Sequence, residues 1–288
     1  MLGQSFDRLL RKNHEVIVTD SKIDISDTFR VIEWAKVNKA DIIINCAAYT
    51  DVDGAEIEVE KSWRVNSNGP MNIAIAAGIV GATPVHFSTD YVFDGKAQAG
   101  YKEEDKANPI NHYGFTKQSG EMRFCSISND CFIVRTSWLF GYTGHNFLKT
   151  MLQLFRTKKE LKVVDDQFGR PTYVDDLAKM TCELLFGDTY QGGVINVTNS
   201  SSGSWFDFAC CIQDKAYELG MIREKIRIIP VNTKDYRPIR RAERPMNSVL
   251  DLKRVEENLA DPIPPWFDAV ERCLKVIKEI EFQESRYG

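Results

Sequence analysis

The chain has 288 residues, of which 43% are hydrophobic and 27% charged, and its formal net charge is -4. This composition is typical of a soluble globular protein with one large domain or two smaller ones, and the charge gives no reason to expect a nucleic-acid partner. Seven cysteines without a C-x-x-C pair, and no signal peptide, predict reduced thiols in the cytoplasm. The longest apolar stretch, residues 73–82, is too short to cross a membrane and predicts a buried helix.

The start of the chain departs from the usual pattern of a dinucleotide-binding unit. Residues 4–12 are helix-like, and residues 16–18 predict a short buried strand that ends near Asp20. Such a unit normally opens with a strand, a glycine-rich turn and a helix, and here only Gly3 could stand for the last glycine of that turn. We expect roughly ten residues to be missing, either because the start codon is assigned too late or because the chain truly lacks a central strand. The first explanation is favoured, since a sheet without its central strand leaves backbone groups unpaired.

Helices and strands then alternate. Ser26 and Asp27 could cap a helix, and the sequence predicts helices over 28–38, 58–78 and 113–126 and strands over 41–45, 84–88 and 131–135. This alternation predicts parallel βαβ units in a doubly wound α/β sheet. Ligands gather at the carboxyl ends of such strands, and Thr50, Thr89 and Trp138 lie just past three strand ends.

The pattern changes beyond Thr136. Helices are predicted over 147–155, 175–186, 205–219 and 266–281, strands over 161–164, 193–197 and 225–230, and a frayed end over 283–288. We expect residues 1–140 to form a dinucleotide-binding domain to which 165–200 returns. Residues 141–164 and 201–288 would form a smaller α/β part that binds the substrate.

A tyrosine and a lysine carry the candidate chemistry. Tyr113 and Lys117 are four apart, so on a helix they share one face. A nearby ammonium lowers the pKa of a phenol from its usual value of about 10, and the hydroxyl of Thr89 could complete a proton-transfer site. Tyr-x-x-x-Lys alone often arises by chance on solvated helices, but its place after Ser88-Thr89-Asp90-Tyr91 makes it more specific.

Several phrases in order along nearly the whole chain resemble the extended short-chain dehydrogenase/reductases, and closely the dTDP-4-dehydrorhamnose reductases. They lie at residues 45–53, 88–95, 113–117, 135–138, 146–147, 166–172 and 244–248. The resemblance implies a Rossmann-like fold and reduction of dTDP-4-dehydro-6-deoxy-L-mannose to dTDP-L-rhamnose by NADPH or NADH. Tyr113 would donate the proton, Lys117 would hold the nicotinamide ribose and tune Tyr113, and Thr89 would bind the sugar oxygen.

The resemblance also implies two sets of binding residues. The cofactor set, beside Tyr113 and Lys117, is Gly3, Asp20, Asp24, Ile25, Ala47, Ala48 and Thr50; the substrate set, beside Thr89, is Val52, Asp90, Tyr91, Trp138 and Arg244. Asn66 resembles a family asparagine near the active site. Asp20 could bind the ribose hydroxyls and favour NADH, because a carboxylate repels a 2′-phosphate, but the preference stays open. From the residues alone, Ala48 could equally serve tight packing and Arg244 a solvated loop.

Other functions stay open. Dehydratases of the wider family have Asp-Glu directly after the threonine, whereas Asp90-Tyr91 follows Thr89 here, which favours simple reduction. The alternatives are a non-catalytic NADP-binding regulatory subunit and another nucleotide-sugar epimerase or reductase. Some relatives hold Mg²⁺ at a dimer interface through glutamates, but no such ligands can be placed here and the four histidines have no ligand spacing. A homodimer is compatible with the sequence, and no membrane partner is expected.

Overall fold

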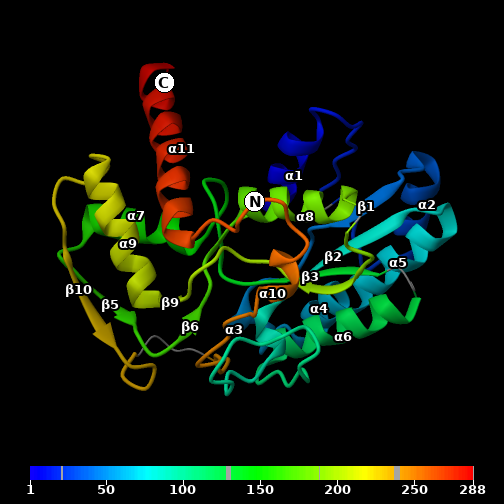
Figure 1. Cartoon of the computed structure of the whole chain (residues 1–288), viewed down its shortest axis with the longest axis horizontal. Coiled ribbons are helices and arrows are strands. Elements are labelled where there is room, and N and C mark those ends of the chain that lie inside the picture. Colours follow the sequence, from blue (N-terminus) through cyan, green and yellow to red (C-terminus); the bar gives the residue numbers. More distant parts are fainter. Residues whose placement is uncertain (21, 128–130, 188, 237–240, 288) are drawn as a thin grey trace.

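The computed structural model describes residues 1–20, 22–127, 131–187, 189–236 and 241–287, and it has two lobes (Figure 1). The larger lobe contains a four-stranded parallel sheet in the order β1-β2-β3-β8, and helices cover both of its faces. The strands are β1 (Ile42–Asn45), β2 (Thr83–Thr89), β3 (Phe132–Thr136) and β8 (Gly193–Asn196). Every residue of β3 is buried, as expected for a central strand covered on both faces. The predicted doubly wound α/β fold is confirmed.

Two apolar cores fill the two faces of this sheet. On one face Phe6 packs with Val85 and Phe87 of β2, and on the other Ile73 packs with Phe124 and Ile133. The first face carries α1 (Leu2–Leu10) and α8 (Val174–Phe186), and the second carries α2 (Thr28–Asn38), α5 (Gly69–Val80) and α6 (His112–Ile127). Asp27 caps α2 as predicted by accepting a hydrogen bond from the backbone of Arg30.

The smaller lobe is built from helices around a short sheet (Figure 1). Strand β5 (Glu160–Val164) pairs in parallel with β10 (Arg227–Val231), and α7 (Phe147–Thr157), α9 (Trp205–Glu218) and α11 (Trp266–Tyr287) pack nearby. Two further short pairs form, β4 (Leu139–Phe140) with β7 (Thr172–Tyr173) in parallel and β6 (Phe168–Gly169) with β9 (Gly203–Ser204) antiparallel. A one-turn helix, α10 (Lys253–Glu256), follows. The predicted domain boundaries stay a prediction.

Three predicted elements differ from the structure. Residues 16–18 form no strand, and Ile17 and Val18 are exposed. A strand needs a hydrogen-bonded neighbour, and among the described residues this segment pairs with none, not even with the free edge of β1. The helix predicted over 58–78 is three pieces, α4 (Val59–Trp63), the π-helical η1 (Arg64–Asn68) and α5. Helix α11 continues to Tyr287 instead of fraying. Within the described residues, no helix is both long and apolar enough to span a bilayer.

Candidate functional site

Two hydroxyl groups meet at the carboxyl end of β2. Thr89 ends that strand, and its Oγ1 accepts a hydrogen bond from the backbone of Tyr91 at 3.2 Å. Tyr113 lies in the first turn of α6. Burial raises the pKa of Tyr113 to about 12, and a hydrogen bond with Thr89 lowers it in part. The two side chains therefore share one site, as the sequence predicted.

A glycine lets α6 approach this strand end. A Cβ at Gly114 would overlap the carbonyl oxygen of Tyr91, so no larger residue fits there. Asn111 Oδ1 accepts a hydrogen bond from the Gly114 backbone at 2.8 Å, which satisfies one of the first amides of the helix. The ring of Tyr91 then meets the ring of Tyr113 edge-on, with centroids 5.9 Å apart.

Lys117 is buried one turn further along α6, on the same face. Its Nζ donates to the carbonyl of Phe87 at 2.5 Å and lies 3.4 Å from Nε2 of His86. Burial lowers the pKa of Lys117 to about 8. The expectation that this ammonium lowers the pKa of Tyr113 is wrong in this structure, because the amine is directed to Phe87 and the pKa of the phenol is raised.

Asp90 was predicted to touch the substrate, but it is buried and faces two hydroxyls of the protein itself. Thr89 donates to its Oδ1 at 2.9 Å, and Ser248 donates to its Oδ2 at 2.5 Å. Burial raises the pKa of Asp90 to about 7, against the effect of these hydrogen bonds. Ser248 had no role in the sequence-based site.

The carboxyl end of β1 presents small, exposed residues. Ala47, Ala48 and Thr50 are all exposed. Asn66, in η1, accepts from the backbone N–H of Tyr49 at 2.8 Å and donates to its carbonyl at 2.9 Å and to Thr116 Oγ1 on α6 at 3.1 Å. The π-helical turn thus ties the β1 loop to the tyrosine helix; such turns are frequent at functional sites.

The other predicted cofactor residues lie at both sides of this strand end. Gly3, at the start of α1, is exposed, and a Cβ there would lie 3.7 Å from Cβ of Cys46. Ile25 packs on Gly69 of α5, and Asp24 and Asp20 are exposed. The hydrogen bonds of Ser26 lower the pKa of Asp24. Small side chains beside a strand end, with a buried lysine and a tyrosine opposite, fit a dinucleotide.

A cavity of about 200 Å³ lies where Tyr91 and Arg244 face side chains of the smaller lobe. It is lined by Tyr91, Phe147, Met151, Lys162, Val163, Val164, Gln167, Trp205, Tyr236 and Arg244. Of the predicted substrate residues, Tyr91 and Arg244 line it. Val52, Thr89, Asp90 and Trp138 are not among the lining residues. Trp138 stacks on Trp205 with ring centroids 3.6 Å apart, and so supports the wall from behind.

Sequence reasoning missed the cavity side chains of the smaller lobe. Trp205 is the first residue of α9, directly after the helix cap Ser204, and the sequence predicted it only as part of the helix over 205–219. Lys162 is a single cation in the otherwise apolar end of β5, and Gln167 is buried in the loop that follows. Because Lys158, Lys159 and Glu160 come just before it, no local signal in the sequence separates Lys162 from an ordinary charged turn.

Arg244 is paired with a carboxylate in this structure. Its two terminal nitrogens each lie 2.7 Å from Asp53 of α3 (Val52–Ala55). Asp53 also accepts from the backbone of Arg241 and Ala242 at 2.8 and 2.9 Å. The hydrogen bond from Arg244 is the main reason that the pKa of Asp53 lies well below its usual value.

Among the residues that the structure describes, no three His, Cys, Asp or Glu side chains are grouped so as to hold a metal ion.

Comparison with known proteins gives a consistent picture. The family model described as "RmlD substrate binding domain" matches residues 1–279. A dTDP-4-dehydrorhamnose reductase of Aggregatibacter actinomycetemcomitans is 38% identical and covers 96% of this chain and 95% of its own. The Escherichia coli K12 enzyme of the same name is 36% identical, over 90% of this chain and 87% of its own.

Solved structures agree in fold. A dTDP-4-dehydrorhamnose reductase from Bacillus anthracis, in complex with NADP, has a TM-score of 0.88 and 38% identity over 95% of this chain and 94% of its own. A dTDP-4-dehydrorhamnose reductase ortholog from Clostridium acetobutylicum has a TM-score of 0.89 and 37% identity over 96% of both chains.

Proposed function

Since the chain belongs to the dTDP-4-dehydrorhamnose reductase family, we propose that it reduces dTDP-4-dehydrorhamnose to dTDP-L-rhamnose with NADPH or NADH. The observation that carries the proposal is the shared site of the Thr89 and Tyr113 hydroxyls at the carboxyl end of a parallel sheet, with Lys117 buried on the same helix. Relatives with this name and an NADP complex of one of them support both substrate and cofactor.

Tyr113 serves as the proton donor. A nicotinamide held at this site would supply the hydride for the carbonyl carbon, and the Tyr113 phenol would give its proton to the carbonyl oxygen as negative charge develops there. A pKa of about 12 keeps Tyr113 protonated at neutral pH, and proton donation becomes favourable as negative charge grows on the sugar oxygen. Lys117 and Ala48 are proposed to hold the cofactor, as the family resemblance implies.

We place part of the nucleotide sugar in the cavity. Ligand pockets are usually about 300–1,000 Å³, so a cavity of about 200 Å³ encloses only part of a nucleotide sugar. Trp205 offers a flat surface to a base, and Lys162 and Arg244 offer positive charge to a diphosphate. We place the reaction in the cytoplasm, in keeping with the free cysteines of the described chain.

The first prediction tests the reaction and Tyr113 together. Purified protein with dTDP-4-dehydro-L-rhamnose and NADPH should lose absorbance at the nicotinamide band. Tyr113→Phe removes the transferable proton and should cut turnover by roughly 10²–10⁴ while NADPH binding is retained. Tyr217→Phe, an exposed tyrosine of the smaller lobe, is the matched control and should be as active as the unchanged protein.

The same assay separates the alternatives. NADPH binding without any turnover by the unchanged protein would favour the non-catalytic regulatory subunit. Turnover that Tyr113→Phe leaves intact would remove Tyr113 from its role but keep the reductase.

A further inference from the structure

Asp90 is a buried carboxylate next to the proposed proton donor, and the proposed reaction gives it no role. It lies in the 3₁₀ turn η2 (Asp90–Val92) that follows β2. Four groups surround it: the hydroxyl of Thr89, the hydroxyl of Ser248, the backbone amide of Tyr91 and the phenol of Tyr113. Its charge would raise the pKa of Tyr113.

The hydrogen bonds around Thr89 limit what its hydroxyl can do. A hydroxyl has one proton to donate. Thr89 Oγ1 donates that proton to Asp90 Oδ1 at 2.9 Å and accepts from the Tyr91 backbone at 3.2 Å. With Asp90 ionised, Thr89 has no proton left for a sugar oxygen and can only accept, as it can from Tyr113. With Asp90 neutral, the carboxyl group can donate to Thr89, and the threonine proton is free to turn towards the substrate.

Ser248 connects this carboxylate to a segment far along the chain. Residues 241–248, which we name the strap, run across the site and are anchored to the larger lobe at several points. Asn247 donates to the carbonyl of Ala97 at 2.8 Å, Asn111 donates to that of Glu243 at 2.7 Å, and Ser248 donates to Asp90 at 2.5 Å. The strap also carries Arg244, which lines the cavity. A single side chain thus joins the strap to the partner of Thr89.

We propose that Asp90 is a positioning residue that sets whether the Thr89 hydroxyl donates or accepts at the reacting oxygen, and that Ser248 of the strap holds it in place. Reduction is fastest when Thr89 donates to the sugar oxygen, which requires Asp90 to be neutral. The inference rests on the proposed reductase function and adds a control of its active site.

The surroundings of Asp90 favour a change in its protonation near neutral pH. Burial raises the pKa of Asp90 to about 7, and the hydrogen bonds of Ser248 and Thr89 limit the rise. Tyr113, with a pKa of about 12, stays protonated throughout this range. Lys117, with a pKa of about 8, is the other group that titrates nearby, and its amine binds Phe87 rather than Asp90.

The test is the pH dependence of the single-turnover rate of reduction, measured from pH 6 to 9 with saturating NADPH. The unchanged protein should lose about tenfold in rate as the pH rises from 6 to 8, the size of one lost hydrogen bond to a charged group. Asp90→Asn is neutral at every pH; its amide can donate to Thr89 while its oxygen accepts from Ser248. This variant should keep the rate of the acidic plateau and lose the step near pH 7.

Two further variants sharpen the test. Ser248→Ala removes a donor that stabilises the ionised carboxylate, so the step should move to higher pH. Asp94→Asn changes another hydrogen-bonded carboxylate of the same loop, which accepts from Tyr101 at 2.7 Å, and should leave the step where it is. A change in rate near pH 8 that all variants share is assigned to Lys117.

The inference is overturned if folded Asp90→Asn keeps the step, or if it is inactive at every pH. If that variant does not fold, an unmoved step in Ser248→Ala overturns it instead. Absence of turnover by the unchanged protein defeats the reductase function and this inference with it, whereas normal turnover with an unmoved profile defeats the inference alone.

Discussion

Beneath the site, burial keeps one histidine neutral. His86 of β2 is buried between Asn45, whose Nδ2 lies 3.1 Å from its Nδ1, and Lys117, whose amine lies 3.4 Å from its Nε2. Burial, and next the charge of Lys117, lower the pKa of His86 well below its usual value. A neutral ring leaves Lys117 as the only cation of this cluster and directs it to the carbonyl of Phe87.

This histidine should make stability depend on pH. The unfolded chain protonates His86 below a pH of about 6.5 and the folded protein does not, so stability is lost as the pH falls through that value. Relative to His86→Gln, the unchanged protein should lose about 1 kcal/mol of unfolding free energy per pH unit between pH 6.5 and 5, measured by urea unfolding. The raised pKa of Asp90 makes the folded protein more stable as the pH falls, which is the opposite effect. Asp90 is present in both proteins, so its effect cancels in the difference between them. His145→Gln, at an exposed position, is the control; parallel curves for the unchanged protein and His86→Gln would contradict the assignment.

Among the elements, the strap and the short helix α3 depend on one carboxylate. Asp53 binds the guanidinium of Arg244 and two backbone amides of the strap. Asp53 and Arg244 are 191 residues apart in the sequence, so this contact ties the strap to a distant segment of the chain, the helix α3. It also holds Arg244, the cation proposed for the diphosphate, at the cavity wall.

Asp53→Asn keeps the shape of the side chain but removes its charge. Asparagine cannot form the charged fork with Arg244, so we expect a loss of about 1–2 kcal/mol in unfolding free energy, a modest value because the pair is partly exposed. KM for the nucleotide sugar should rise more than kcat falls. Asp51→Asn is the matched control in the same helix: Asp51 caps α3 through the backbone of Gly54, and asparagine caps equally well. Equal effects of both substitutions would show that the contact between Asp53 and Arg244 does not hold the strap in place.

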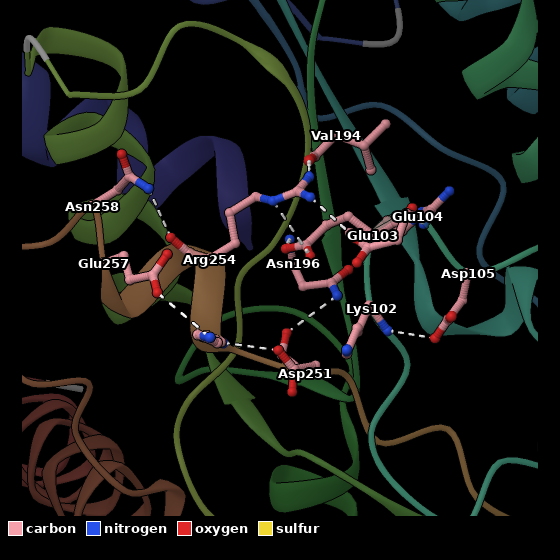
Figure 2. A network of polar contacts seen from close by, with 12 residues as sticks. Lys102, Glu103, Glu104, Asp105, Val194, Asn196, Asp251, Arg254, Glu257 and Asn258 are labelled. Carbon is pink, nitrogen blue, oxygen red and sulfur yellow. Dashed lines mark hydrogen bonds and ion pairs between the residues drawn. The ribbon is translucent and has the colours of Figure 1, made fainter.

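At the scale of the whole molecule, buried charge connects the sheet to the loops that cover it. Arg135 of β3 binds Glu121 of α6 at 2.7 Å, and both side chains are only 7% exposed. Arg135 also donates to the carbonyl of Glu103 at 3.1 Å. Figure 2 shows how the network continues: Glu103 accepts from the backbone of Asn196 at 3.0 Å and lies 3.7 Å from Arg254 of α10. Strand β8, α10 and the loop that carries Glu103 are thus held on one polar network.

Removal of one partner of the buried pair should be costly. Glu121→Gln leaves the guanidinium of Arg135 buried without its counter-charge, and we expect a loss of about 3–5 kcal/mol in unfolding free energy by chemical denaturation. Glu271→Gln removes a surface carboxylate that pairs with Lys215 and Lys275, and should leave the midpoint nearly unchanged. Similar losses in both variants would show that burial of the pair does not raise the free-energy cost of removing its carboxylate.

Much of this molecule could be predicted from its sequence, for physical reasons. The alternation of apolar strands and amphipathic helices predicted the sheet, because each pattern can bury its apolar side chains in only one way. Thr89 could be placed at the site because it ends a parallel strand, whereas Tyr113 was placed there by its spacing from Lys117 and by the family resemblance. The direction of Lys117 could not be predicted, since a flexible amine takes the nearest acceptor, here Phe87, which only the folded chain brings close.

The remaining surprises depend on contacts between distant segments. The pairing of Asp53 with Arg244 and of Asp90 with Ser248 joins residues 191 and 158 positions apart. No local pattern encodes such a pair. The missing strand over residues 16–18 has the same cause, because a strand is defined by its neighbour and not by its own residues.

The stacked indoles have one more consequence. Trp138 and Trp205 lie face to face, with an interplanar angle of 6°, and one of them forms part of the cavity wall. The electronic transitions of aromatic rings this close are coupled, so excitation of one ring affects the other. The protein therefore has an intrinsic optical probe at the place where a base would lie, and occupancy could be followed in the near-ultraviolet without any added label.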